Sequence, residues 1–229
     1  MRLRRPSGGM GLIEDITIRF GRIKPTVRFH TPISASPARH GPLYPPSMPT
    51  ARHELARAIA EVALLRGTFT LRSGRTSRYY LDKYLFSTRP ELLRELGEMF
   101  AERIALVTGR TPPDRLAGAE LGGIPLVTAA SLATGIPSVF VRNAKKDYGT
   151  ARQLEGRLEP GERVVFVEDV ATTGGQALEA VRTLRGAGAE VLAVICVIDR
   201  QEGARENVEA EGLRFESLFT KHDLGITDE

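Results

Sequence analysis

The sequence of 229 residues contains no tryptophan and a single cysteine, Cys196. One cysteine cannot form an internal disulfide, so the fold must be stabilised by its hydrophobic core. A single cysteine is also consistent with a reducing compartment. Cys196 stands in the run VLAVICVI, where we expect a buried, unreactive thiol rather than a nucleophile. This is the longest apolar run, and it is much shorter than the ~20 residues that a transmembrane helix needs.

The N-terminal region also lacks the apolar segment of about 7–15 residues that a secretory signal peptide requires. We therefore expect a cytoplasmic protein with no membrane partner. Most of the chain also lacks an excess of positive charge. Residues 1–50 hold eight basic and two acidic side chains, whereas the remaining residues hold 24 basic and 26 acidic side chains. The part after residue 50 thus lacks the basic character that nucleic-acid binding usually requires.

The first fifty residues contain eight of the fourteen prolines. Proline fixes φ and removes an amide donor, so we expect residues 1–48 to be a disordered basic extension and residues 49–229 to form the folded domain. Thr50 is a suitable N-cap for the helical pattern that follows, which makes Met48 a candidate translation start. The alternative is that the extension is an arm for nucleic-acid binding or for targeting.

After residue 50, helical and strand patterns alternate. Apolar residues at helical spacing predict helices over 50–67, 89–107, 122–134, 172–188 and 201–212. Apolar or alternating segments predict two short strands within 69–82 and single strands over 114–120, 137–143, 162–169 and 191–200. Uniformly apolar strands separated by helices favour an α/β fold with a parallel sheet covered on both faces. In such sheets ligands bind at the carboxyl ends of the strands.

The most informative motif is VVFVEDVATTGGQA, residues 164–177. An apolar strand ends in Glu168 and Asp169, and a Thr-Thr-Gly-Gly turn then opens a helix. Amides at a helix N-terminus, hydroxyls of Thr172 and Thr173 and closely packing glycines form a cradle for phosphate. Carboxylates beside a phosphate must face hydroxyls or a divalent metal, and a ribose 5-phosphate satisfies both requirements. Because no lysine follows the glycines, the motif is not a Walker A loop.

This string resembles the signature of type I phosphoribosyltransferases, and the resemblance extends over about residues 55–225. It implies the type I fold, in which helices flank a parallel sheet and a small N-terminal hood covers the site. It further implies that Asp169 is catalytic. The residues that it assigns to phosphoribosyl pyrophosphate in this motif are Glu168, Asp169, Val170, Ala171, Thr172, Thr173, Gly174, Gly175 and Gln176.

The segment RNAKKDYGT, residues 142–150, is similar to the flexible catalytic loop of orotate phosphoribosyltransferases. Arg142 and Lys146 match that loop, whereas Asn143 and Tyr148 replace its second basic residue and its histidine. The resemblance implies that Arg142, Lys146 and Tyr148 bind phosphoribosyl pyrophosphate and that Lys146 is catalytic. It also implies a homodimer, because in the family this loop closes over the site of the neighbouring subunit.

The segment FTLRSGRTSRYYLD, residues 69–82, resembles the hood segment of the same family. By this resemblance Arg72 contacts the pyrophosphate group, and Tyr79 and Tyr80 help to line the pocket for the base. The segment GAELGGIPLVTAA, residues 118–130, resembles the loop that holds the pyrophosphate. Many relatives have a lysine where this chain has Gly122.

The segment IDRQEGA, residues 198–204, contains Arg200, whose counterpart in orotate enzymes pairs with the orotate carboxylate. Thr172 is the other residue from the sheet that the resemblance assigns to orotate. The implied reaction converts orotate and phosphoribosyl pyrophosphate to orotidine 5′-monophosphate and pyrophosphate in pyrimidine biosynthesis. The resemblance implies Mg²⁺ as cofactor, held mainly through the pyrophosphate and ribose rather than by protein ligands.

Two other functions are consistent with this fold. One is a phosphoribosyltransferase for adenine or xanthine, against which Arg200 and the hood segment argue. The other is a binding protein that senses phosphoribosyl pyrophosphate and regulates transcription. Lys146 argues against the second, because a sensor does not need a catalytic lysine.

Overall fold

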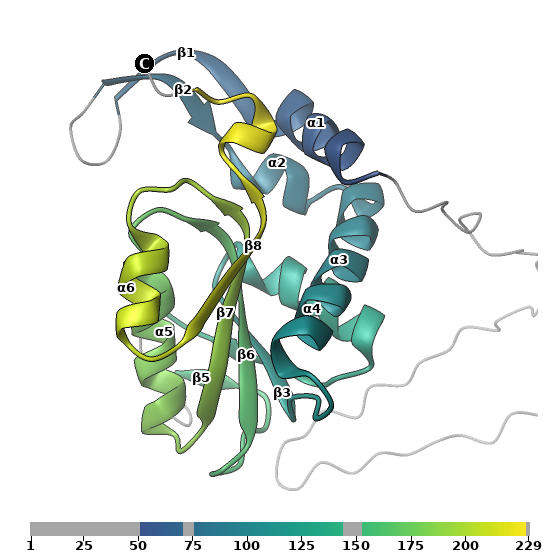
Figure 1. Ribbon diagram of the computed structural model, residues 1–229, viewed down its shortest axis with the longest axis vertical. Helices are drawn as coiled ribbons and strands as arrows, with labels where there is room; N and C mark the ends of the chain where they lie inside the picture. The colour runs from purple at the N-terminus through teal and green to yellow at the C-terminus, as the bar shows by residue number, and fades with distance from the viewer. Residues whose placement is uncertain (1–50, 71–75, 144–152, 228–229) are drawn as a thin grey trace, which may run out of the picture. The chain divides into compact units, whose positions relative to one another are not determined.

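The structure is a computed structural model that describes residues 51–70, 76–143 and 153–227. Its central sheet has six strands in the order β5-β4-β3-β6-β7-β8 (Figure 1). Neighbouring strands are parallel except for the short edge pair β4–β5, which is antiparallel. The strand bounds are β3 Arg115–Ala119, β4 Ser138–Val141, β5 Leu154–Glu155, β6 Arg163–Ala171, β7 Glu190–Asp199 and β8 Arg214–Thr220. The predicted mostly parallel sheet is confirmed.

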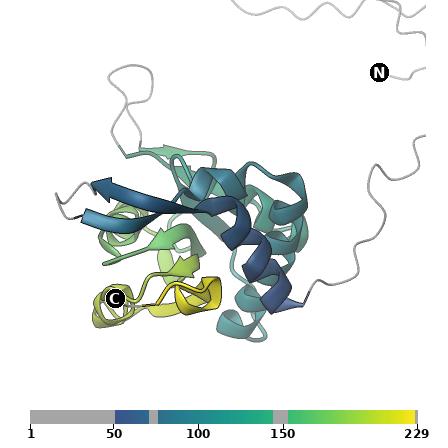
Figure 2. The ribbon, with the colours of Figure 1, turned by 90° about the horizontal axis from the view of Figure 1, so that it is seen from above.

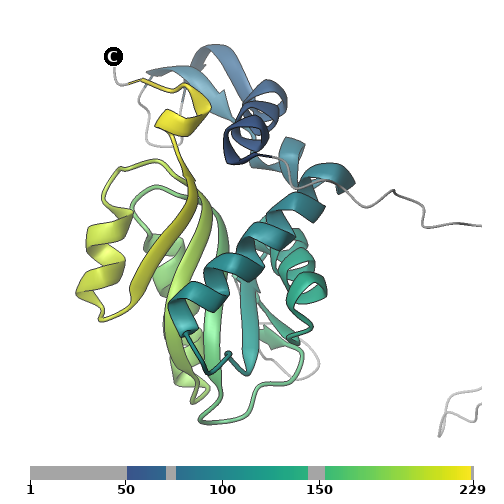
Figure 3. The same ribbon diagram turned by 45° about the vertical axis from the view of Figure 1, so that its right-hand side comes forward.

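Helices cover both faces of this sheet (Figures 1 and 3). Helices α3 (Pro90–Thr108) and α4 (Gly123–Thr134) pack on one face, and α5 (Gly175–Gly186) and α6 (Ala204–Ala210) pack on the other. Alternate residues of β6 enter different apolar clusters, because successive side chains of a strand point to opposite faces. None of the described helices has the length and apolarity needed to cross a bilayer.

The N-terminal part of the described chain forms the hood. It consists of α1 (Arg52–Ala63), the antiparallel hairpin of β1 (Leu64–Thr70) and β2 (Thr76–Leu81), and the short α2 (Lys83–Ser87). The predicted helix over 50–67 is wrong after Ala63. Leu64 and Leu65 continue the apolar pattern, but they pair with Leu81 and Tyr80 in the hairpin, so the chain is extended there. Figure 2 shows the hairpin and α1 from above.

Other boundaries differ in ways that affect the site. Strand β6 continues to Ala171, two residues beyond its predicted end, so Glu168 and Asp169 are not its last residues. Helix α5 begins at Gly175, which leaves Thr172, Thr173 and Gly174 as the turn. The sequence did not predict the edge strand β8, nor the short elements α2, β5 and the 3-10 helix η1 (His222–Leu224). The predicted extension over 1–48, with Met48, lies outside the described residues.

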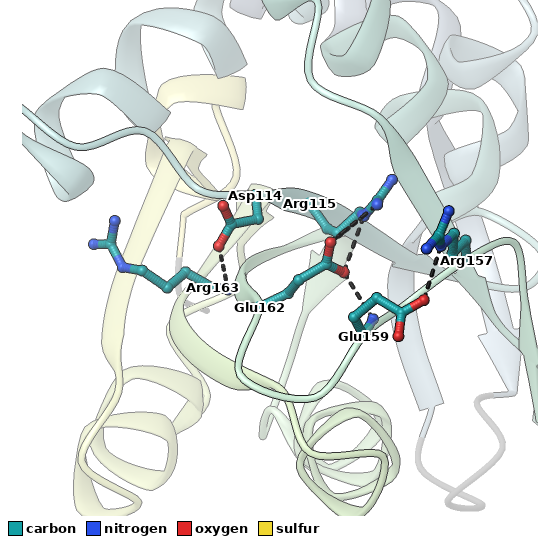
Figure 4. A network of polar contacts seen from close by, with 6 residues as sticks. All are labelled: Asp114, Arg115, Arg157, Glu159, Glu162 and Arg163. Atoms are coloured by element: carbon teal, nitrogen blue, oxygen red, sulfur yellow. Dashed lines mark hydrogen bonds and ion pairs between the residues drawn. The ribbon is translucent and has the colours of Figure 1, made fainter.

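A polar network joins the amino ends of β3 and β6 (Figure 4). The guanidinium of Arg115 donates two-pronged hydrogen bonds to the carboxylate of Glu162, at 3.0 Å from Nε and 2.9 Å from Nη2. The hydrogen bond from Arg115, followed by one from the Glu159 backbone, lowers the pKa of Glu162. Asp114 accepts a hydrogen bond from the Arg163 backbone at 2.8 Å. This network therefore fixes the register of the two strands at the end opposite the sequence motifs.

Candidate active site

The turn between β6 and α5 is held in place by α6. Gly174 has a φ of 76°, a conformation that glycine adopts at little cost, and an added Cβ would lie 3.2 Å from Cγ2 of Val208. The side-chain amide of Asn207 donates a hydrogen bond to the carbonyl of Thr173 at 2.9 Å. Thr173, Gly175 and Gln176 are exposed. The first amides of α5 lack intrahelical acceptors, so the turn presents donors to an anion.

Two adjacent carboxylates precede this turn, and both are buried. Glu168 is 4% exposed and Asp169 is 2% exposed. Glu168 accepts a hydrogen bond from the Asp169 amide at 3.0 Å, and Asp169 accepts one from the Val170 amide at 2.6 Å. Burial, reinforced by the neighbouring charge of Asp169, raises the pKa of Glu168 to about 8. Burial therefore favours the protonated form of Glu168, which is able to donate a hydrogen bond as well as to accept one.

A lysine from the hood reaches this carboxylate pair. Lys83, the first residue of α2, places Nζ 2.8 Å from Oδ2 of Asp169. Burial disfavours its charge, but the attraction and hydrogen bond of Asp169 outweigh this effect, so the pKa of Lys83 is raised. Lys83 was not predicted from the sequence. The sequence shows only that Lys83 directly follows the hood segment 69–82. Its partner Asp169 lies on β6, which is far away in the sequence.

Two of the residues expected to bind the base, Tyr79 and Arg200, come together at the end of β7. Arg200 donates a hydrogen bond through Nη2 to the hydroxyl of Tyr79 at 3.2 Å, and its guanidinium lies 5.6 Å from the centre of that ring. The backbone amide of Arg200 donates to the carbonyl of Ala171 at 2.9 Å, which joins this segment to the end of β6. Arg200 also pairs with Glu202 at 2.8 Å. Its buried Nε has no hydrogen-bond partner among the described residues.

Tyr79 and Tyr80 have different surroundings. Tyr79 is partly buried beside Arg200, whereas Tyr80 is 46% exposed and its ring lies 5.7 Å from that of Phe69. The alternation of side chains along β2 accounts for this difference. The structure thus brings Tyr79 to Arg200, and the role of Tyr80 in the base pocket stays a prediction.

The loop before α4 approaches the carboxylates closely. A Cβ at Gly122 would overlap Oδ2 of Asp169 and would lie 3.4 Å from Cε of Lys83. The backbone of Gly122 has a φ of −71° and a ψ of −29°, which any residue adopts. Glycine at this position is therefore explained by the space that the Asp169 carboxylate occupies and not by backbone conformation.

The start of the predicted catalytic loop is attached to the same region. The Asn143 amide donates a hydrogen bond to Oε1 of Glu120 at 2.8 Å, and its side chain donates to the Glu120 carbonyl at 3.2 Å. Arg142 directly follows β4, and its Nη1 lies 3.8 Å from Oε1 of Glu155. Arg142 and Gln176 both line a small hollow. Asn143, which replaces a basic residue of the family pattern, thus joins the two loops. Arg72, Lys146 and Tyr148 lie outside the described residues.

Comparisons with known proteins agree with this arrangement. The sequence model of the phosphoribosyl transferase domain matches residues 86–213. The orotate phosphoribosyltransferase of Natronomonas pharaonis is 46% identical over 175 residues, which cover 76% of this chain and 97% of the relative. That of Pyrococcus furiosus is 42% identical over 174 residues, covering 76% and 94%. The crystal structure of Mycobacterium tuberculosis orotate phosphoribosyltransferase in complex with phosphoribosyl pyrophosphate matches with a TM-score of 0.65 and 35% identity, covering 76% of this chain and 99% of that one.

Proposed function

The chain belongs to the orotate phosphoribosyltransferases of the phosphoribosyl transferase family, and we propose that it transfers the 5-phosphoribosyl group of phosphoribosyl pyrophosphate to orotate. The products are orotidine 5′-monophosphate and pyrophosphate, which places the reaction in pyrimidine biosynthesis. One observation carries this proposal. The buried carboxylate pair and the phosphate turn of β6–α5 lie beside the arginine–tyrosine pair at the end of β7.

The turn from Thr172 to Gln176 binds the 5-phosphate through backbone amides and threonine hydroxyls. The carboxyl groups of Glu168 and Asp169, with the backbone of Val170 and Ala171, then face the ribose. Substitution at C1 of ribose passes through a state with positive charge on the ring, and a carboxylate fixed beforehand near this charge stabilises it. The burial of both side chains supports this role, because water does not screen them.

The leaving pyrophosphate requires positive charge. Arg142, Lys146, Arg72 and Tyr148 are the residues that we assign to it, and Lys146 is the principal one. Mg²⁺ would bind mainly through the pyrophosphate and the ribose of the substrate, and we assign no protein residue to it as a direct ligand. When bound, Mg²⁺ would neutralise charge that develops on the pyrophosphate. Closure of the loop that contains Lys146 would exclude water, which otherwise hydrolyses the activated sugar.

Orotate carries a carboxylate that a planar guanidinium recognises well. Arg200 offers such a group at the end of β7, with Tyr79 beside it, and Thr172 directly follows the neighbouring strand β6. The unpaired Nε of Arg200 supports this role, because a buried donor without a partner is costly unless a ligand satisfies it. Tyr80 is the remaining candidate for this pocket.

We further propose a homodimer in which each subunit supplies the loop 142–150 to the other. The similarity of this loop to that of the family supports the proposal. The single cysteine supports a cytoplasmic location.

A spectrophotometric assay of orotate consumption with phosphoribosyl pyrophosphate and Mg²⁺ tests the function. Adenine and xanthine, measured in parallel, test the alternative of purine salvage. Consumption of orotate alone supports the proposal, and turnover of a purine without orotate would refute it.

A further inference from the structure

Two polar contacts connect the hood to the strand ends that form the site. The first joins Tyr79 to Arg200 on the base side. The second joins Lys83 to Asp169 on the ribose side, at 2.8 Å. The second contact has no role in the function proposed above. Its cation stands on a different element from the carboxylate that it meets, so the contact forms only when the hood is seated on the sheet.

The burial of its acidic partner makes this contact energetically important. Burying a charged carboxylate removes its hydration and costs free energy, and Asp169 is only 2% exposed. The buried carboxyl group of the adjacent Glu168 increases this cost. The side chain of Lys83 is 30% exposed and therefore keeps part of its hydration while it compensates that charge. An ion pair with one hydrated partner avoids much of the desolvation penalty of a fully buried pair.

The residue opposite the pair is adapted to it. Gly122 has a backbone conformation open to any residue, yet an added Cβ would overlap the carboxylate oxygen that Lys83 contacts. The absence of a side chain at 122 is thus what allows the carboxylate to occupy its position beside Lys83. Lys83, Gly122 and Asp169 form one unit drawn from α2, the start of α4 and β6.

We propose that Lys83 is a positioning residue of the reaction, which orients the carboxylate of Asp169 for the ribose of phosphoribosyl pyrophosphate. Lys83 acts through Asp169 and does not touch the base. This inference rests on the proposed function for the identity of the ligand. It predicts that loss of the cation weakens the binding of phosphoribosyl pyrophosphate and leaves the KM for orotate nearly unchanged.

The test compares Lys83→Gln, Lys83→Arg and the control Arg57→Gln in the full chain. Arg57 forms an exposed ion pair with Glu61 on α1, so its variant removes one positive charge from a different helix from that of Lys83. Binding of phosphoribosyl pyrophosphate with Mg²⁺ is measured by calorimetry without orotate. We expect Lys83→Gln to weaken binding about tenfold, which corresponds to ~1.4 kcal/mol. Lys83→Arg should restore most of the affinity, and Arg57→Gln should bind as the wild type does.

Gly122→Ala provides a second route if Lys83→Gln does not fold, as judged by thermal unfolding. The added methyl group displaces the Asp169 carboxylate while Lys83 remains. We expect Gly122→Ala to weaken the binding of phosphoribosyl pyrophosphate as Lys83→Gln does. Unchanged binding in Lys83→Gln, failure of Lys83→Arg to restore it, or an equal loss in Arg57→Gln would each overturn the inference. Binding is measured without turnover, so absence of orotate consumption by the wild type would refute the proposed function and leave this comparison interpretable.

Discussion

At the residue scale, Arg200 is the side chain to which the proposed function assigns the choice of base. Its guanidinium is largely buried, touches Tyr79 and Glu202, and retains one donor without a described partner. Orotate differs from uracil by a carboxylate. A site with a buried cation disfavours the ligand that leaves this cation unpaired.

We therefore expect Arg200→Ala to raise the KM for orotate and to narrow its advantage over uracil. Loss of a charge-assisted contact with a stranded partner costs on the order of 2–5 kcal/mol, which is roughly 30-fold to several thousand-fold. The KM for phosphoribosyl pyrophosphate should change far less, because the β6–α5 turn is intact. Steady-state kinetics with both substrates measures this, and wild-type kinetics for orotate would reduce Arg200 to a structural residue.

The buried carboxyl of Glu168 makes stability depend on pH. Its pKa is about 8 in the folded protein and 4.5 as an ordinary side chain. Between these values the folded state holds a proton that the unfolded chain has released, so the stability that it contributes is lost as the pH rises through this window. Glu168→Gln should remove this dependence. Urea unfolding gives the free energy of unfolding at about pH 5 and about pH 8. This free energy should decrease less between the two pH values for the variant than for the wild type, and equal decreases would contradict a raised pKa of Glu168.

At the scale of elements, the phosphate turn depends on a helix that does not belong to its motif. Helix α6 approaches Gly174 through Val208 and binds the Thr173 carbonyl through Asn207. The backbone contact between Arg200 and Ala171 joins the β7 end to the same turn. The segment 199–208 thus contacts both the part of the site that we propose for phosphate and the part that we propose for the base.

Asn207→Ala should raise the KM for phosphoribosyl pyrophosphate by about fivefold, because a lost neutral hydrogen bond is worth ~1 kcal/mol. The control is Glu206→Ala, an exposed neighbour on the same helix, which should leave this KM unchanged. Equal values for Asn207→Ala and the wild type would show that the turn holds its shape without α6.

The sequence predicted the elements that local patterns define and missed those that depend on distant partners. The strands and helices from residue 89 to residue 212 have clear periods, and their types are confirmed. The end of α1 was misplaced because Leu64 continues a helical pattern but pairs across a hairpin with Leu81. The Thr-Thr-Gly-Gly turn after β6 was predicted from its own residues, although α5 begins at Gly175 and not at the predicted residue 172. Lys83 was missed because its significance depends on Asp169, which only the fold brings near.

At the scale of the whole molecule, the hood is fastened to the sheet at several points. Arg52 at the start of α1 forms a two-pronged ion pair with Asp223 in η1, with both oxygens at 2.9 Å. The hydrogen bond from Arg52 is the main reason that the pKa of Asp223 is lowered to about 2. Together with the contacts of Tyr79 and Lys83, this pair fixes the hood in relation to the ends of the strands.

The proposed exchange of loops between subunits has its own test. Lys146→Ala and Asp169→Ala should each be nearly inactive alone, because they disable the loop and the ribose site respectively. A hybrid dimer would contain one site with neither defect, so equimolar mixing with full exchange should restore roughly a quarter of the wild-type activity. Absence of recovery after verified exchange would contradict a loop that acts in trans.

The most direct measurement for the account as a whole is kcat/KM for phosphoribosyl pyrophosphate in the double variant Glu168→Gln, Asp169→Asn. The two substitutions keep the shape of the side chains and remove the acidic groups next to the proposed ribose site. We predict a decrease of at least about 100-fold, as for the loss of other electrostatic groups that stabilise a transition state, with the thermal unfolding transition retained. A decrease of less than about threefold in a folded variant would contradict the claim that these carboxylates serve the transferred ribose.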